Sequence, residues 1–444
     1  MLKTEYTMGK NVDLFSDFPA LSDEAWRAKV IEDLKGKDFA ETLVWTDAQG
    51  IDHEPYYRAS DIKGNPLVAA IQKAQQKSGT WKVAQSLQFE GSEAELKEAI
   101  EQALENGVEE VLVYGLDEAA ALKMSKHFTS KNKALRFQLE SIPQSKNFFF
   151  QLDPIASYLK SGVSNVKAAE LKSIFEAKAA DKNDRFLLVD GSIYKSAAAN
   201  VVQEMACVLQ HALAYFDELT TAGLSAKAIA DRMEFKLAFD NSYFLEIAKS
   251  RALRYLIDKL FKAYEVETQA YIWGAASMAY LSHKDFYTNL LRTTTQSMAA
   301  VVGNCDKVST LAFDSLQASS KLGLRMAKNI PLILSEEAYL SEVSDMAAGS
   351  YYIESLSASF AEKAWDEFLK MEAAGGLIKL FESGELQKEL DASWQQQQIA
   401  YKKEGRSMVG VNKYINEQAD TLTVKADGFS GKGLKMHLLA KEID

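Results

Sequence analysis

The chain has little cysteine and little proline. Its 444 residues include six prolines and two cysteines, Cys207 and Cys305. Two cysteines that form no C-x-x-C pair exclude a disulfide framework. We expect both to be buried thiols in a reducing, cytoplasmic compartment. Because proline breaks helix interiors, its scarcity favours a helix-rich chain.

Long apolar runs and an excess of positive charge are also missing. No run approaches the roughly 18 apolar residues that span a bilayer, and the first residues lack the apolar core of a secretory signal. The 51 basic and 62 acidic side chains give a formal net charge of −11, which argues against a nucleic-acid-binding protein. The sequence therefore predicts a soluble cytoplasmic protein that binds neither nucleic acid nor membrane.

The rest of the composition is that of an ordinary globular protein. Apolar residues make up 47% of the chain and charged residues 25%, which is close to the average. A chain of this length can bury a large core, either as one barrel or as two to three smaller domains.

Residues 1–80 are predicted to form an N-terminal extension that wraps a partner. Ser22 is a suitable N-cap for a helix with an acidic first turn, and Gly36 is expected to end that helix. The stretch Trp45–Pro66 contains several aromatic residues between glycines and prolines. It is expected to be irregular chain whose exposed aromatics dock onto another surface.

A strand–helix alternation begins at Val83 and predicts an α/β protein. Eight candidate strands lie at 83–89, 111–114, 134–139, 148–152, 186–189, 233–239, 269–273 and 308–313. Nearly all are followed by a helical pattern, so residues 81–372 are predicted to form a (β/α)8 TIM barrel. An open doubly wound sheet is the alternative, but the chain lacks an obvious Gly-rich phosphate loop.

Residues 373–444 are predicted to form a helical C-terminal segment and a tail. Helical patterns are expected at 319–337, 355–372 and 377–390. The chain from Thr421 onward alternates weakly and is expected to be a solvated terminal segment.

Few residues suggest chemistry on their own. The five histidines are far apart: His53, His127, His211, His283 and His437. No H-x-x-x-H pair results, so no metal site is predicted. Barrel enzymes place active sites at the carboxyl ends of their strands. Asp190 and Asp240 are expected at such ends, although each could equally cap the following helix.

Several motifs, in order, resemble methylmalonyl-CoA mutases. They include Arg292-Thr293-Thr294, Lys328–Leu334, Gly349–Glu354 and Gly410–Tyr414. The resemblance covers roughly residues 14–415. The stretches Leu14–Pro19 and Pro55–Arg58 are similar to the start of the family's small, or beta, subunit.

The departures from the family pattern concern its active site. Catalytic members carry a Tyr-His pair where this chain has Ser192 and Ile193, and isoleucine can neither donate a hydrogen bond nor transfer a proton. The family's polar acyl-CoA lining is replaced at Tyr271–Ser277, and its His-Thr-Asn segment at Ser309–Leu311. The family's cobalt-binding Asp-x-His-x-x-Gly motif is absent. We therefore expect no catalytic, cofactor-binding or metal residues in this chain.

The resemblance implies a structural subunit of an isomerase. Its partner is expected to be the catalytic large (alpha) subunit, which holds adenosylcobalamin and interconverts methylmalonyl-CoA and succinyl-CoA in propionate metabolism. The chain itself is then non-catalytic, and the complex is a heterodimer. One alternative is an independent barrel enzyme that acts on another acyl-CoA-like substrate through Asp190, Lys195 and Asp240. A metallochaperone or regulatory module is a third reading, which no feature specifically supports.

Overall fold

The computed structural model divides the chain into two compact units, one ending at Tyr57 and the other beginning at Arg58. It describes residues 21–128, 134–145, 147–163, 168–179, 181, 184–403, 405–424 and 432–443. The Leu14–Pro19 motif lies outside the described residues. Within the described part of the chain, no helix is both long enough and apolar enough to cross a membrane.

The first unit contains two short helices and two short strands in its described part. They are α1 (Asp23–Asp33), α2 (Phe39–Leu43), β1 (Trp45–Thr46) and β2 (Asp52–His53). Ser22 caps α1 as predicted, because its hydroxyl accepts from the backbone N–H of Ala25 at 3.2 Å. The prediction of irregular chain from Trp45 was wrong in part, since β1 and β2 pair as an antiparallel hairpin. No residue of α1 is buried.

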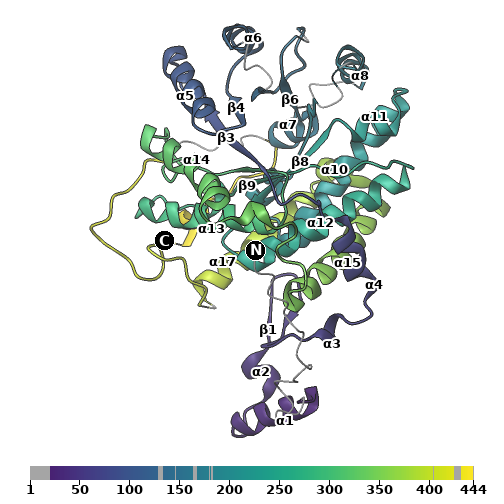
Figure 1. The fold of residues 1–444 in the computed structure, drawn as a ribbon, viewed down its shortest axis with the longest axis vertical. Helices are drawn as coiled ribbons and strands as arrows, with labels where there is room; N and C mark the ends of the chain where they lie inside the picture. The colour runs from purple at the N-terminus through teal and green to yellow at the C-terminus, as the bar shows by residue number, and fades with distance from the viewer. Residues whose placement is uncertain are drawn as a thin grey trace, which may run out of the picture. The chain divides into compact units, whose positions relative to one another are not determined.

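The second unit contains a closed barrel of eight parallel strands (Figure 1). The strands are β3 (Lys82–Gln88), β4 (Glu110–Tyr114), β5 (Leu135–Leu139), β6 (Phe150–Leu152), β7 (Leu187–Asp190), β8 (Met233–Phe239), β9 (Ile272–Ala276) and β10 (Lys307–Ser309). Each strand pairs with its neighbours in the sequence, and β10 closes the barrel against β3. The predicted TIM barrel is therefore confirmed.

Helices cover the outside of this barrel. They are α3 (Ala59–Ile62), α4 (Pro66–Ala74), α5 (Glu93–Glu105), α6 (Glu118–His127), α7 (Pro154–Ser161), α8 (Ala168–Ala177), α9 (Ser192–Ser196), α10 (Val201–Thr221), α11 (Ala226–Ala230), α12 (Tyr243–Ala263), α13 (Asn289–Val302), α14 (Lys321–Glu336) and α15 (Tyr351–Ala373). Short 3-10 turns are η2 (Met278–Tyr280), η3 (Phe286–Thr288) and η4 (Leu340–Glu342). Helix α4 packs against α12 and α15. Residues 58–80 therefore belong with the barrel unit, whereas the sequence predicts an extension that ends at residue 80.

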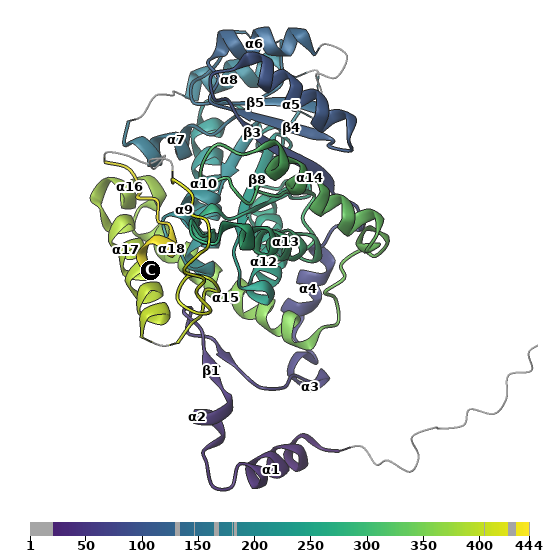
Figure 2. The same ribbon diagram turned by 90° about the vertical axis from the view of Figure 1, so that its left-hand side faces the viewer.

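The remaining helices lie together at one side of the barrel (Figure 2). They are α16 (Gly376–Ser383), α17 (Glu385–Lys402) and α18 (Leu439–Ile443). The single helix predicted at 377–390 is two helices, because Gly384 between them has a φ of +82°. The prediction of a solvated tail was wrong for the described residues. Leu434 and Leu438 are buried, and so is Ile443, because they cover apolar surface at the end of the barrel.

Candidate functional site at the carboxyl ends of the strands

The carboxyl ends of the barrel strands open into a cavity of about 1680 Å³. We call this end of the barrel the mouth. Side chains from seven strands line it, among them Gln88, Tyr114, Gln138, Asp190, Lys236, Ala276 and Ser309. The cavity continues outward between α5 and α14, where Gln102 and Arg325 line it. Active sites of TIM-barrel enzymes lie at this end, so the mouth is where chemistry is to be sought.

Asp190 lies in the mouth but serves the turn that follows it. Its Oδ1 accepts from the backbone N–H of Ser192 at 3.1 Å and from the Ser192 hydroxyl. Its Oδ2 accepts from Lys236 Nζ at 3.3 Å. Burial opposes the charge of Lys236, but the neighbouring Asp190 outweighs it and raises the pKa of this lysine. Asp190 is therefore held by the start of α9 and by one cation.

Lys195 and Asp240 are brought together, but they do not line the cavity. Lys195 Nζ lies 2.5 Å from Asp240 Oδ2 and 3.2 Å from Glu246 Oε1. Lys249 Nζ in turn lies 2.5 Å from Glu246 Oε2 and 2.8 Å from Glu204 Oε2. None of these five side chains lines the cavity. The structure therefore separates Asp190 from the Lys195–Asp240 pair.

These five buried groups carry two positive and up to three negative charges. Burial, with a contribution from the Asp240 charge, raises the pKa of Glu246 to about 7. Burial also tends to raise the pKa of Asp240, but the charge of Lys195 outweighs burial and lowers this pKa to about 2. Because three carboxylates face two ammonium groups, Glu246 is the group that takes up a proton.

The positions matched to the family's Tyr-His pair offer no imidazole. Ile193 is 2% exposed and lines the cavity with an aliphatic side chain. The hydroxyl of Ser192 already donates to Asp190. Tyr194, next in α9, is completely buried, and its hydroxyl lies 3.0 Å from Nδ1 of His211.

A buried hydrogen-bond network around Asp153 was not predicted from the sequence. Asp153 Oδ1 lies 2.9 Å from His211 Nε2 and accepts from the Tyr215 hydroxyl at 2.8 Å. It also caps α7, accepting from the N–H of Ala156 at 2.8 Å. The Asp153-Pro154 dipeptide is an N-cap signal that could have located the helix start. Nothing in the sequence indicates its pairing with His211, which lies in α10. This network positions α7 and α10 rather than facing the cavity.

One histidine reaches the cavity, and its ring is already packed. His437 lines the mouth and stacks on Trp394, with ring centroids 4.4 Å apart. Within the part of the chain that the structure describes, no three His, Cys, Asp or Glu side chains are grouped so as to hold a metal ion.

The barrel axis beneath the mouth is occupied by Trp273. This side chain of β9 is completely buried, and its Nε1 donates to Ser309 Oγ at 2.8 Å. Two ammonium groups lie near its ring centroid, Lys236 Nζ at 4.7 Å and Lys307 Nζ at 4.3 Å. The ring packs with Ala84, Leu112, Leu188 and Ala275. Both cations are favourably placed for the negative faces of an indole.

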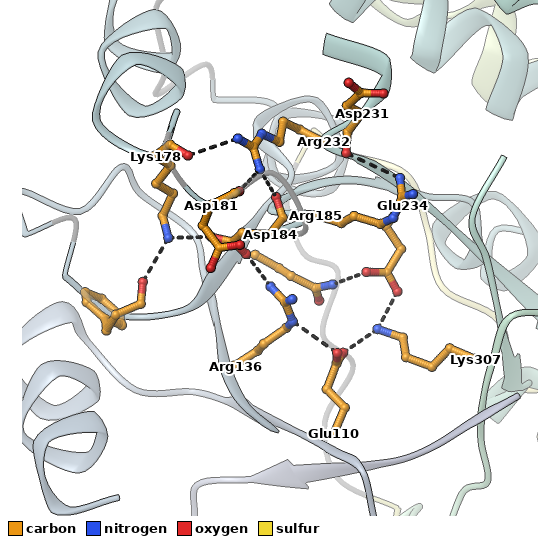
Figure 3. Close-up of polar contacts among 12 residues, drawn as sticks. Glu110, Arg136, Lys178, Asp181, Asp184, Arg185, Asp231, Arg232, Glu234 and Lys307 are labelled. Carbon is orange, nitrogen blue, oxygen red and sulfur yellow. Dashed lines mark hydrogen bonds and ion pairs between the residues drawn. The ribbon is translucent and has the colours of Figure 1, made fainter. Parts of the chain in front are cut away.

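An ionic network fills the axis at the amino ends of the strands (Figure 3). Lys307 Nζ lies 2.6 Å from Glu110 Oε1 and also pairs with Glu234. Arg136 Nε lies 3.1 Å from Glu110 Oε2, and Gln151 Nε2 donates to Glu234 at 2.8 Å. Because these residues belong to β4, β5, β6, β8 and β10, their contacts must cross the barrel interior.

The network keeps Glu110 ionised and extends to the barrel wall. Burial tends to raise the pKa of Glu110, but the charges of Lys307 and Arg136 outweigh it and lower that pKa to about 2. Arg136 Nη1 also lies 2.7 Å from Asp184 Oδ1, and Lys178 Nζ lies 2.6 Å from Asp184 Oδ2. Together with Trp273, this network leaves the barrel axis packed below the mouth.

Comparisons with known proteins agree on one family. The family model described as methylmalonyl-CoA mutase matches residues 162–433. A methylmalonyl-CoA mutase small subunit of Porphyromonas gingivalis is 31% identical over 91% of this chain and 71% of its own length. A small subunit of Propionibacterium freudenreichii subsp. shermanii is 29% identical over 86% of this chain and 66% of its own length. A methylmalonyl-CoA mutase of Rhizobium meliloti is 32% identical, but the match covers 53% of this chain and 34% of that protein.

Proposed function

Because the chain belongs to the methylmalonyl-CoA mutase family, we propose that it is the small, non-catalytic subunit of a heterodimeric mutase. In this proposal a catalytic large subunit holds adenosylcobalamin and interconverts methylmalonyl-CoA and succinyl-CoA. The chain contributes structure: it stabilises the large subunit by covering one of its faces.

The closed barrel axis is the observation that carries this proposal. Trp273 is completely buried across the axis, and the Glu110–Lys307–Glu234 network lies below it. A thioester threaded into this barrel would have to displace a packed indole and separate buried ion pairs. Separating such pairs leaves uncompensated charge in the interior. The barrel axis of this chain therefore does not fit an acyl-CoA.

The mouth also does not fit the cofactor. His437, the imidazole on the cavity wall, is stacked on Trp394 instead of projecting toward a bound corrin. Ser192 and Ile193 provide a hydroxyl already bonded to Asp190 and an aliphatic side chain. In this proposal the cofactor and the chemistry belong to the large subunit.

The alternative of an independent barrel enzyme requires Asp190, Lys195 and Asp240 to act at one site. Asp190 lines the cavity, whereas Lys195 and Asp240 form a buried ion pair with 3% and 6% side-chain exposure. General acid–base catalysis requires such groups to lie within hydrogen-bonding reach of one substrate. These three residues do not share a site, and no observation favours this function.

The first unit supports the partner contact. Among its described residues, four large apolar side chains are exposed: Leu21 (63%), Ile31 (47%), Trp45 (48%) and Tyr56 (56%). Aromatic residues are enriched in the cores of protein interfaces. Obligate interfaces bury a total of roughly 2,000 Å² or more. The exposed aromatic side chains of this unit are therefore suited to form part of a stable interface with a partner.

Co-expression with the large mutase subunit of the same organism tests the proposal. Size-exclusion chromatography with light scattering is expected to show a stable 1:1 complex. The double variant Trp45→Ser/Tyr56→Ser is expected to weaken this complex without lowering the thermal stability of the barrel. Lys77→Ser in the exposed chain before β3 is the matched control. The proposal is contradicted if this chain elutes as a monomer or homodimer, separately from the co-expressed large subunit.

A further inference from the structure

Residues 432–443, which we call the strap, lie across one side of the barrel mouth. Their backbone is tied to two elements at the carboxyl ends of the strands. The N–H of Leu434 donates to the carbonyl of Leu159 in α7 at 2.8 Å, and the N–H of His437 donates to the carbonyl of Ser196 in α9 at 2.9 Å. The strap then ends in α18, which packs against α17 and η2. Figure 2 shows it beside α9 and α17.

The strap is both a wall of the cavity and a buried part of the core. Met436, His437 and Leu438 line the cavity. On one side Leu438 belongs to an apolar cluster with Leu281, Leu316 and Leu422. On the other side Leu439, Ala440 and Ile443 pack into a cluster that includes Tyr280, Trp394 and Met408. Such burial from both sides favours the closed position.

A glycine allows the strap to approach α7 closely. A Cβ placed on Gly433 would overlap the backbone carbonyl of Lys160. Gly162, just after α7, would place a Cβ 2.9 Å from that of Lys432. The two glycines therefore let the strap pass close to the end of α7, because any side chain at Gly433 forces the strap and α7 apart.

We propose that the strap is a cover that closes the barrel mouth on its α7–α9 side. With the strap in place the cavity is reached from the side of α5 and α14, where lining residues such as Leu322 are 53% exposed. Displacing the strap opens a second route on the α7–α9 side. This inference does not depend on the proposed mutase function.

Ser277 offers a position from which access to the covered cavity can be measured. It follows β9, lines the cavity and is 1% exposed. Its hydroxyl has no hydrogen-bond partner among the described residues. Ser277→Cys therefore introduces a thiol without breaking a side-chain bond. The two native thiols are poor competitors, because burial raises the pKa of Cys207 and of Cys305, and a thiol that stays protonated reacts slowly.

The test compares alkylation of Ser277→Cys by N-ethylmaleimide in three backgrounds. We expect Gly433→Ala to accelerate labelling at least tenfold, because the added methyl lifts the strap from α7. The control Lys435→Ala changes an exposed residue of the same segment and is expected to leave the rate unchanged. The chain that carries only its native cysteines gives the background rate.

Circular dichroism and thermal melting establish that each variant is folded. If Gly433→Ala fails to fold, Leu434→Ala, which shortens a buried anchor of the strap, replaces it. Equal labelling rates in the parent and in the folded strap variant overturn the proposal, because the strap then closes no route to the cavity. A tenfold acceleration by Lys435→Ala overturns it equally.

Discussion

At the scale of single residues, Trp273 decides what this barrel can accommodate. A side chain at this position of β9 projects into the barrel, where alternate strands must supply enough volume to fill the interior. The indole does so, with its N–H bonded to Ser309 and two lysines beside its ring. The same packing that stabilises the barrel excludes a ligand from its axis.

Replacing Trp273 by alanine is expected to lower the free energy of unfolding by about 3–5 kcal/mol, as for other large-to-alanine changes in cores. Urea denaturation followed by circular dichroism measures this loss. Tyr414→Ala is the control, since that aromatic ring is 74% exposed. Equal losses for the two variants contradict the assignment of Trp273 to the packed axis.

Lys307 is expected to be critical because it is shared by two buried carboxylates, Glu110 and Glu234. In Lys307→Met both carboxylates keep their burial and lose this cation, so the expected loss of stability is about 3–5 kcal/mol. The loss should shrink in acid, where the carboxylates are protonated. Lys321→Met breaks the exposed pair with Glu98 and should leave stability nearly unchanged. Indistinguishable urea midpoints for the two variants contradict this account.

The pKa of Glu246 makes stability depend on pH near neutrality. Its folded-state pKa of about 7 exceeds the ordinary value of 4.5, so the folded protein holds a proton that the unfolded chain releases. The stabilising contribution is complete below about pH 4.5 and is lost as the pH rises through 7. Between pH 5 and pH 8 the parent is expected to lose about 1–3 kcal/mol more stability than Glu246→Gln. Parallel pH profiles from urea titrations contradict the expectation.

At the scale of elements, local patterns predict the barrel strands well. The strand at 233–239 has the predicted bounds. Its apolar run and the polar residues on either side of it, Asp231 and Asp240, indicate the same two ends. The last strand was predicted at 308–313, but β10 ends at Ser309. Its ladder partners there are Ala84 and Ala275. Beyond Ser309 the chain turns into the mouth, although its residues remain apolar.

Tertiary contacts explain the elements that the sequence could not predict. The tail from Thr421 has too weak a pattern to form structure alone, yet its leucines are buried against α17, η2 and the mouth. Such burial depends on surfaces that are distant in the sequence. The helix break at Gly384 is a local signal that was overlooked, since glycine readily adopts positive φ at helix ends.

Gly384→Ala is expected to destabilise the protein by about 1 kcal/mol, because alanine at a φ of +82° is strained in the left-handed region. Lys388→Ala on the exposed face of α17 is the control and should be nearly neutral. Thermal unfolding of the two variants measures the difference. A stabilised Gly384→Ala protein would show that α16 and α17 can join into one helix.

At the scale of the whole molecule, the residues of the candidate site could be predicted only in part. The sequence predicts that Ser192 and Ile193 stand in place of the family's Tyr-His pair, and this stays a prediction. The ionic network could not be predicted, since Glu110, Glu234 and Lys307 are each more than 70 positions apart and meet only when the barrel closes. The separation of Asp190 from Lys195 likewise depends on the direction of α9.

The most direct test of the central claim is the number of adenosylcobalamin molecules bound to the purified complex. Equilibrium dialysis with absorption spectroscopy, on the complex and on this chain alone, provides that number. The account predicts one molecule per 1:1 complex, none on this chain alone, and mutase turnover only when the large subunit is present. Two molecules per complex, or saturable binding by this chain alone, would contradict it.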